Sequence, residues 1–244
     1  MKTTPTVSDS PPARHQMPLR YTSWIAEKCR EDPGVRKQLA GGLRLPLDHK
    51  RVQPMHRYVT RWLPKGASDE EQRAYYTVAA LIAAQPRIRR GADEESVPAA
   101  DSGSQDPDQH ADTDGAAAPP TAPAKSALYG QSLGTAFAHA AIDAPSRERV
   151  MRTETAERTL HLLTRQSTNG LHRHLPAAVL YLRDLDVPVD WAQLLQDLIR
   201  WPTWSGRISR RWLQDFHRLR TKEEECLSEE KDQQQVLDPS DTEG

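Results

Sequence analysis

The stretch DWAQLLQDLIRWPTWSGRISRRWLQDFHRL, residues 190–219, carries four of the six tryptophans of this 244-residue chain, together with five arginines. Its first half predicts a helix, because apolar residues recur at the spacing of one helix face. These residues are Trp191, Leu194, Leu195, Leu198 and Ile199. Asp190 stands just before them, where an N-cap residue is expected. The stretch therefore indicates a helical fold.

The second half, about 205–220, predicts another helix with two different faces. Its apolar face carries Ile208, Trp212, Phe216 and Leu219. At 100° per residue, four arginines fall within one arc on the opposite side: Arg207, Arg210, Arg211 and Arg218. One face is predicted to join the core, and the other is a stripe of positive charge.

The four tryptophans divide into two pairs by position. Trp191 and Trp212 lie on the apolar faces, so we predict that both are core residues. Trp201 and Trp204 flank Pro202 at the bend between the helices. A packed corner is favoured there over an exposed aromatic that stacks on a base or contacts a partner.

The rest of the chain also has helical periodicity. Ser68 and Glu71 form a capping box that opens a helix to about residue 85. An apolar stripe over 171–185 predicts another helix, which begins near residue 175 or is kinked there because of Pro176. Further helices are predicted at 21–31, 50–63, 131–142 and 146–166. Sustained alternation and hairpin turns are absent from the sequence. We predict an all-α protein built as one or two small helical bundles.

Composition divides the chain into five segments. Residues 1–19 hold four prolines and few apolar side chains, residues 91–125 are rich in Asp, Ala, Pro and Gly, and residues 221–244 are acidic. Such segments bury too little apolar surface to offset the entropy of ordering, so disorder is predicted for all three. The remaining segments, 20–90 and 126–220, are predicted to be two helical blocks.

The net charge is distributed unevenly among these segments. The insert 91–125 has eight acidic residues and one lysine, and the tail 221–244 has nine acidic residues and two lysines, so each carries −7. Because the whole chain carries −1, the remainder carries +13. A surplus of this size indicates a polyanionic partner, nucleic acid or an anionic membrane surface. A solvated basic surface without a partner is the alternative.

Other features argue against membrane insertion and structural disulfides. No stretch approaches the roughly 20 apolar residues of a spanning helix, and the N-terminus lacks the apolar core of a signal peptide. Of the two cysteines, Cys226 lies in the predicted tail, so a disulfide with Cys29 is not expected. We expect a cytosolic protein.

Catalytic and metal-binding motifs are lacking. His172 and His174 would point about 200° apart on a helix and are interpreted as surface histidines. Three carboxylates near the basic stripe are interpreted as an N-cap and polar-face residues: Asp190, Asp197 and Asp215. No phosphate-binding loop, nucleophile elbow, HExxH motif or EF-hand loop occurs. The sequence predicts a binding protein, not an enzyme, with no cofactor, no metal and no small-molecule substrate.

Several stretches resemble a known family. They are GVRKQL, RYVTRWLP, YGQSLGTAFAHA, LPAAVLYLR and, most specifically, VPVDWAQLLQDLIRWPTWSGRISRRWLQDFHR, within about residues 24–218. The chain is similar to CasB, the small subunit of the type I-E CRISPR surveillance complex, Cascade. The resemblance implies an all-helical, non-catalytic protein in antiviral defence. It would be present as two copies beside the backbone and large subunits, and it would hold the target and displaced DNA strands opened by the guide RNA.

This role suits a surface that contacts nucleic-acid backbones without reading sequence. R-loop formation is nearly balanced in base-pairing energy, so modest protein contacts can favour it, and arginine binds phosphate through forked donors. Where relatives carry an arginine pair, this chain has Ala40 and Gly41, so contacts in the first block must come from neighbouring residues. The candidate nucleic-acid-binding residues are Arg36, Lys37, Arg44, Arg165, Arg173, Arg207, Arg210 and Arg211.

Two alternatives remain open from the sequence. The helix pair could be a helix-turn-helix transcription regulator with 205–220 as its recognition helix, although its arginine stripe offers few side chains for reading base edges. A metal-dependent nuclease would need carboxylates clustered near the stripe.

Overall fold

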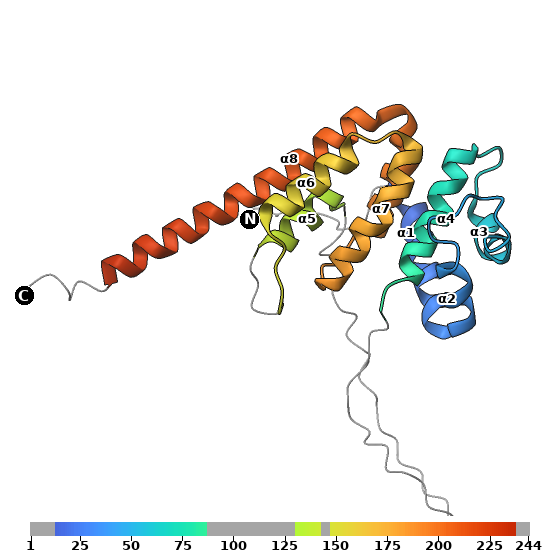
Figure 1. The fold of residues 1–244 in the computed structure, drawn as a ribbon, viewed down its shortest axis with the longest axis horizontal. Helices are drawn as coiled ribbons and strands as arrows, with labels where there is room; N and C mark the ends of the chain where they lie inside the picture. The colour runs from blue at the N-terminus through green and yellow to red at the C-terminus, as the bar shows by residue number, and fades with distance from the viewer. Residues whose placement is uncertain (1–12, 87–129, 143–146, 238–244) are drawn as a thin grey trace, which may run out of the picture.

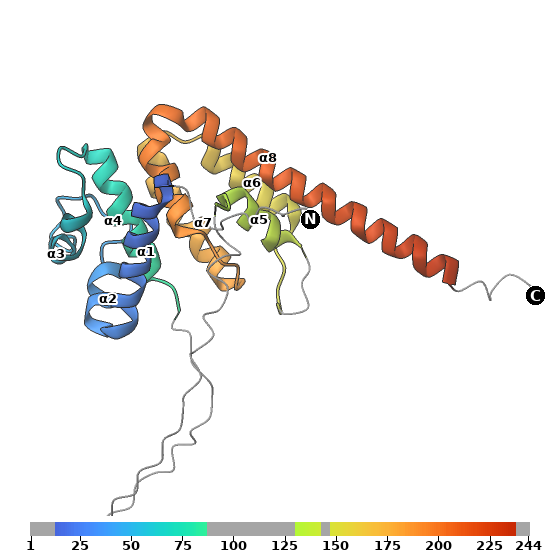
Figure 2. The same ribbon diagram turned by 180° about the vertical axis from the view of Figure 1, so that it is seen from behind.

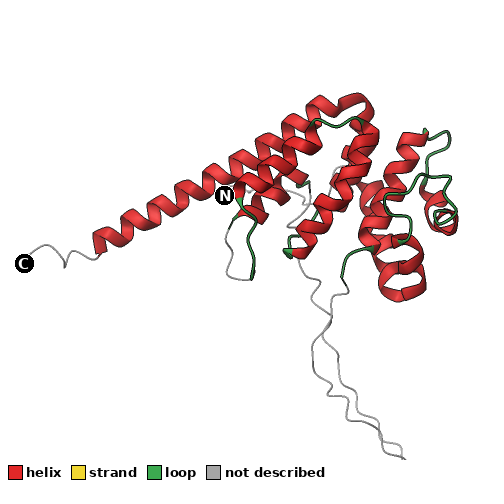
Figure 3. Ribbon diagram, in the orientation of Figure 1, coloured by secondary structure: helices red, strands yellow, loops and turns green. Residues whose placement is uncertain are grey.

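The computed structural model describes residues 13–86, 130–142 and 147–237, and within these ranges it contains helices and no strand. The prediction of an all-α fold is confirmed. Figures 1 and 2 show the helices from opposite sides, and Figure 3 shows that loops make up the rest of the described chain. The elements are α1 (Ala13–Glu31), α2 (Pro33–Ala40), η1 (Gln53–Met55), α3 (His56–Val59), η2 (Thr60–Trp62), α4 (Asp69–Ala83), α5 (Leu133–Ala141), α6 (Thr153–Thr164), α7 (Thr168–Asp184) and α8 (Trp191–Leu237).

The first part of α8 is the central helix of the molecule. Every residue from Ala192 to Leu198 is buried, because α1 and α4 pack on α8 from the first block and α5 packs on it from the second. This burial joins the two predicted blocks into one continuous apolar core. The predicted helix is confirmed in the first part of α8, but its polar residues Gln193, Gln196 and Asp197 are buried as well.

A bend divides α8 at Trp204, whose backbone is not helical (φ −125°, ψ 24°). Trp201 is buried at the bend, where its ring lies 5.2 Å from that of Trp212 and its Nε1 donates to the carbonyl of Gln166 at 3.3 Å. Trp204 is 54% exposed. The predicted packed corner is therefore correct for Trp201 and wrong for Trp204. Trp212 is a core residue as predicted, whereas Trp191 is only partly buried.

The bend gives no support to the helix-turn-helix interpretation. That motif joins its helices through a turn of three to four residues, whereas helix resumes here directly after Trp204. Beyond the bend, Ile208, Trp212 and Phe216 are buried as predicted. The second part of α8 then continues past the other helices (Figures 1 and 2).

Helix α5 packs very closely on this second part of α8. A Cβ atom at Gly134 would lie 1.8 Å from the carbonyl oxygen of Trp212, a backbone atom that cannot rotate away. The absence of a side chain at Gly134 therefore allows the two helices to approach this closely. This contact positions the outer face of α8 relative to the rest of the fold.

Several predicted helix starts are present in the structure. The hydroxyl of Ser68 accepts from the backbone N–H of Glu71 at 3.2 Å, and Asp190 accepts from that of Gln193 at 2.9 Å. Helix α7 starts earlier than expected, because Ser167 caps it by accepting from Gly170 at 3.3 Å. Pro176 lies inside this helix, so a start near residue 175 is wrong.

Both terminal segments are more helical than their composition predicted. Helix α1 begins at Ala13, and α8 continues to Leu237, so the prediction of disorder is wrong for residues 13–19 and 221–237. The tail is rich in Glu, Lys and Gln, which favour helix, and it extends a helix that is already formed, so no new nucleus is needed. The insert 91–125 lies outside the described residues.

Candidate nucleic-acid interface

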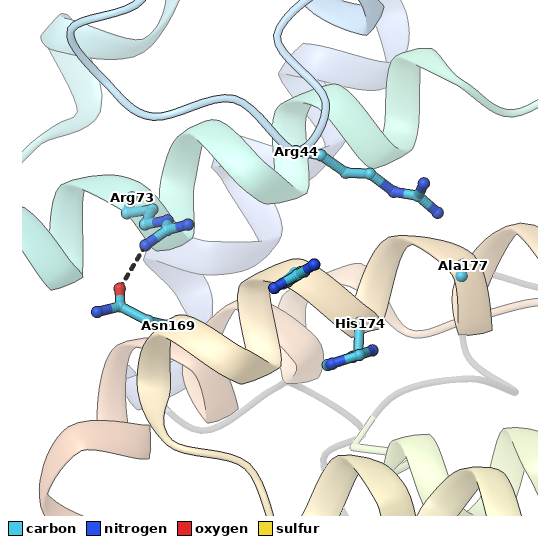
Figure 4. Close-up of a pocket in the computed structure, with 6 residues that line it drawn as sticks. Arg44, Arg73, Asn169, His174 and Ala177 are labelled. Carbon is cyan, nitrogen blue, oxygen red and sulfur yellow. Dashed lines mark hydrogen bonds between the residues drawn. The ribbon is translucent and has the colours of Figure 1, made fainter.

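A cleft lies between the first and second blocks, with a cavity volume of about 570 Å³. The loop after α2 lines one side with Arg44, α4 contributes Arg73, and α7 contributes the opposite wall (Figure 4). The wall residues are Asn169, Arg173, His174 and Ala177. Three arginines thus line the cleft without any carboxylate, which gives it a strongly positive potential.

Arg44 reaches this cleft through an unusual backbone conformation. It has a φ of 65°, in the left-handed region that side chains other than glycine rarely adopt. Its side chain is exposed and extends over α7 in Figure 4. Strained backbone of this kind tends to occur at functional sites. The loop therefore holds a predicted basic residue of the first block close to Arg173, a predicted basic residue of the second.

Arg73 was missed by the sequence analysis, yet it joins the two walls of the cleft. Its Nη1 donates to Oδ1 of Asn169 at 2.6 Å, which ties α4 to the first turn of α7 (Figure 4). Arg73 is the only basic residue in α4, and three acidic residues precede it in the first turn. The sequence offers little sign of this role, because the three acidic neighbours make the local charge of the helix negative.

His172 lies beneath the cleft and is buried, so its interpretation as a surface histidine is wrong. Its Nδ1 is hydrogen-bonded to the hydroxyl of Thr77 at 3.0 Å, which gives a second link between α4 and α7. Burial, together with the nearby charge of Arg73, lowers the pKa of His172 to about 4. The imidazole is therefore neutral at neutral pH and adds no charge to the cleft. His174 is half-buried and does line the cleft.

A second, more acidic depression adjoins the first and shares Arg73 and Asn169 with it. Its lining includes three carboxylates, Asp48, Asp69 and Glu70. These residues bound the positive cleft on one side, because their charge repels a polyanion.

The arginine stripe on α8 is only partly available. Arg207 and Arg210 are exposed, and neither forms an ion pair with any residue in the described parts of the chain. Arg211 differs, because its guanidinium pairs with both carboxylate oxygens of Asp197. Arg211 therefore supports the fold and is not a free cation of the stripe.

Asp197 is 2% exposed, so its interpretation as a polar-face residue is wrong. Besides the ion pair with Arg211, it accepts from Nε1 of Trp212 at 2.7 Å and from Nε2 of Gln193 at 2.8 Å. A buried carboxylate needs such partners to offset its lost hydration. Asp197 thus joins the two parts of α8 across the bend.

Arg36 also has an internal role. Its Nε donates to the carbonyl of Ala83 at 2.9 Å, and its Nη2 donates to that of Gln85. Arg183 donates to the intervening carbonyl of Ala84 at 3.0 Å. Together they satisfy carbonyls at the C-terminus of α4, where positive charge is also favourable. Neighbouring Lys37 is exposed on α2 and is not part of the cleft.

Arg165 belongs to the corner of the fold around the α8 bend. It is exposed and follows Thr164, whose carbonyl accepts from the hydroxyl of Ser209 at 3.1 Å. The structure therefore brings the predicted residues together in two groups. Arg44 and Arg173 lie at the cleft, and Arg165, Arg207 and Arg210 lie on or beside the second part of α8.

Neither a metal cluster nor a membrane-spanning helix occurs in the described residues. Within the ranges 13–86, 130–142 and 147–237, no group of three or more His, Cys, Asp or Glu side chains is arranged to hold a metal ion. None of the helices in the described part of the chain combines the length and the apolar character needed to cross a membrane.

Comparisons with known proteins agree with this architecture. A family model of the CRISPR-associated protein Cse2 matches residues 42–217. Two solved chains from structures described as a CRISPR RNA-guided surveillance complex, one of them pre-nicking, each have a TM-score of 0.63. They are 28% and 29% identical to this chain, covering 86% and 85% of it and 96% of each solved chain.

The crystal structure of a Cse2-family protein from Thermus thermophilus has the same fold. Its TM-score is 0.50 at 20% identity, and the alignment covers 82% of this chain and 97% of that one. No curated protein sequence matches this chain.

Proposed function

The chain belongs to the CRISPR-associated Cse2 family, the small subunits of type I-E complexes, and we propose that it holds opened target DNA within such a complex. In this role it is a non-catalytic subunit that contacts nucleic-acid backbones without sequence preference. Its partners would be the backbone and large subunits, a second copy of itself, the guide RNA, and the target and displaced DNA strands.

The observation that carries this proposal is the cleft of Arg44, Arg73 and Arg173. Guanidinium groups bind phosphate oxygens through paired donors, and the lining contains no carboxylate that would compete for them. Because opening the duplex and forming the guide heteroduplex nearly balance, a few such contacts suffice to shift the equilibrium towards the open state.

The geometry also supports backbone binding over base readout. Side chains that read base edges project from a recognition element that enters the major groove. The cleft and the arginine stripe on α8 instead present arginines, which suit contacts with phosphates. The cleft lies instead between two helices and a loop, an arrangement suited to the irregular path of an opened strand.

The test uses the assembled complex carrying the double variant R44A/R173A. A matched control, R20A/R30A, removes the same charge from exposed positions on α1. Affinity for target DNA is measured as a function of salt concentration. We expect the double variant to bind more weakly and to lower the slope of log K against log salt by about 1.4, since each phosphate contact with a single strand contributes about 0.7. The control should keep the parent slope.

Two results would contradict the proposal. If R44A/R173A binds target DNA like the parent, the cleft does not contact the nucleic acid. If the variant is folded but does not assemble, the cleft faces another subunit.

A further inference from the structure

Trp204 is the most exposed tryptophan of the bend and takes no part in the core. Its side chain is 54% exposed, while Trp201, three residues earlier, is 1% exposed. The non-helical backbone of Trp204 interrupts α8 at this point. The structure thus presents one large aromatic ring to solvent on a corner whose other tryptophans are buried. Tryptophan combines a large apolar ring with a polar N–H and is enriched at interfaces for this reason.

Positive charge surrounds this ring along the chain. From Leu198 to Gln214 the sequence contains four arginines and no acidic residue, and of these arginines only Arg211 is paired within the described part of the chain, with Asp197. Arg200 and Arg207 are exposed, and neither is engaged in an ion pair anywhere in the described residues. They lie four residues before and three residues after Trp204, one on each side of the bend.

The corner is also rigid. The hydrogen bond from Trp201 to Gln166 and the hydrogen bond from Ser209 to Thr164 fix both sides of the bend on the connection between α6 and α7. The backbone that carries Trp204 is therefore defined before a partner binds, which lowers the entropy lost on binding.

We propose that Trp204 stacks on an unpaired base of single-stranded nucleic acid, while Arg200 and Arg207 contact the flanking phosphates. The combination of an exposed aromatic with cations and no carboxylate suits this partner, because every base has a π-face and every linkage carries a negative charge. In a duplex the faces of the bases are already stacked on one another and are not available to an aromatic side chain. This inference rests on the proposed function, and it assigns single-stranded nucleic acid to the bend of α8 at Trp204.

The test compares two single-stranded probes of equal length, a thymidine oligonucleotide and the same backbone without bases. The isolated protein should bind the thymidine probe about 5- to 150-fold more tightly, the factor that corresponds to stacking of one base at about 1–3 kcal/mol. W204A should lose this preference while retaining its affinity for the abasic probe and for duplex. W204F should keep most of the preference and lose the quenching of tryptophan fluorescence that the thymidine probe produces.

The matched control is Tyr181→Ala, which removes another exposed aromatic, 41% exposed on α7, and should leave the preference unchanged. Circular dichroism checks that each variant is folded. If the parent binds both probes equally, or if W204A keeps the preference, the stacking role is wrong while the backbone role stands. If W204A keeps the preference but fails to enter the complex, Trp204 contacts a protein subunit. If the parent binds no probe, the proposed function itself fails.

Discussion

The ion pair between Arg211 and Asp197 provides a sharp test of which arginines support the fold. Truncation of Arg211 to Ala removes the charged partner of a carboxylate that is only 3% exposed. Two neutral donors remain on Asp197, from Trp212 at 2.7 Å and from Gln193 at 2.8 Å. The variant must therefore bury a negative charge with incomplete compensation, or open the bend to water.

The expected loss follows from the burial of the two partners. Removing one partner of a buried ion pair costs about 3–5 kcal/mol, but Arg211 is 40% exposed, so part of its interaction is already screened. We expect R211A to lower the free energy of unfolding by about 2–3 kcal/mol, which corresponds to a melting temperature lower by about 4–12 °C. The control R210A removes an exposed, unpaired charge from the same helix and should change stability by less than about 0.5 kcal/mol.

Urea unfolding followed by circular dichroism measures both values, and a double-mutant cycle identifies the cause. Asn at position 197 still accepts from Trp212 but carries no charge, so R211A/D197N should be more stable than R211A by at least about 1 kcal/mol. If R211A is as stable as R210A, Arg211 is only a solvated charge. If the second change gives no recovery, the loss in R211A does not come from the unpaired carboxylate.

Three further predictions concern other parts of the fold. Burial holds the pKa of His172 at about 4, below its unfolded value of about 6.5, so the free energy of unfolding should be highest above pH 6.5 and should fall by about 2 kcal/mol between pH 7.5 and pH 5. H172Q should lack this part of the loss. An identical dependence of stability on pH in the variant and the parent would refute the assignment. G134A should lower the free energy of unfolding by about 3 kcal/mol or more, because its Cβ would collide with the backbone of Trp212. The control G206A places its Cβ where no atom lies within 4 Å and should be neutral or stabilising. Equal effects of the two changes in thermal melts would contradict the close approach of α5 and α8. Deletion of residues 221–244 should reduce the helical signal but leave the melting temperature of the core nearly unchanged. It should also tighten DNA binding at low salt, because a charge of −7 is removed. A markedly lower melting temperature of the truncated protein would show that the tail stabilises the core.

The sequence was sufficient for features that depend on one helix alone. The apolar spacing of Ile208, Trp212 and Phe216 predicted which face of α8 is buried, and Ser68 and Asp190 marked where helices begin. These signals are local, because periodicity and capping involve residues within two turns of each other. Of the two alternatives for α7, a start near residue 175 was wrong, because Pro176 is tolerated within a longer packed helix.

Features that depend on several helices could not be predicted in this way. Asp197 looked like a polar-face residue, because Arg211 and Trp212 approach it only when α8 bends back on itself. The same holds for His172, which is enclosed between α7 and α4. Among the arginines, charge alone did not distinguish Arg36 and Arg211, which bind groups within the chain, from Arg44 and Arg173, which meet across the cleft.

The positions of the two basic surfaces indicate how a strand would cross the molecule. The cleft includes Asn169, and the bend contacts Gln166, three residues earlier in the connection between α6 and α7. The depression with Asp48, Asp69 and Glu70, which also includes Thr168 and Asn169, would repel phosphates at this end of α7. If one strand contacts both the cleft and the exposed ring of Trp204, R44A and W204A should both weaken binding of the same oligonucleotide.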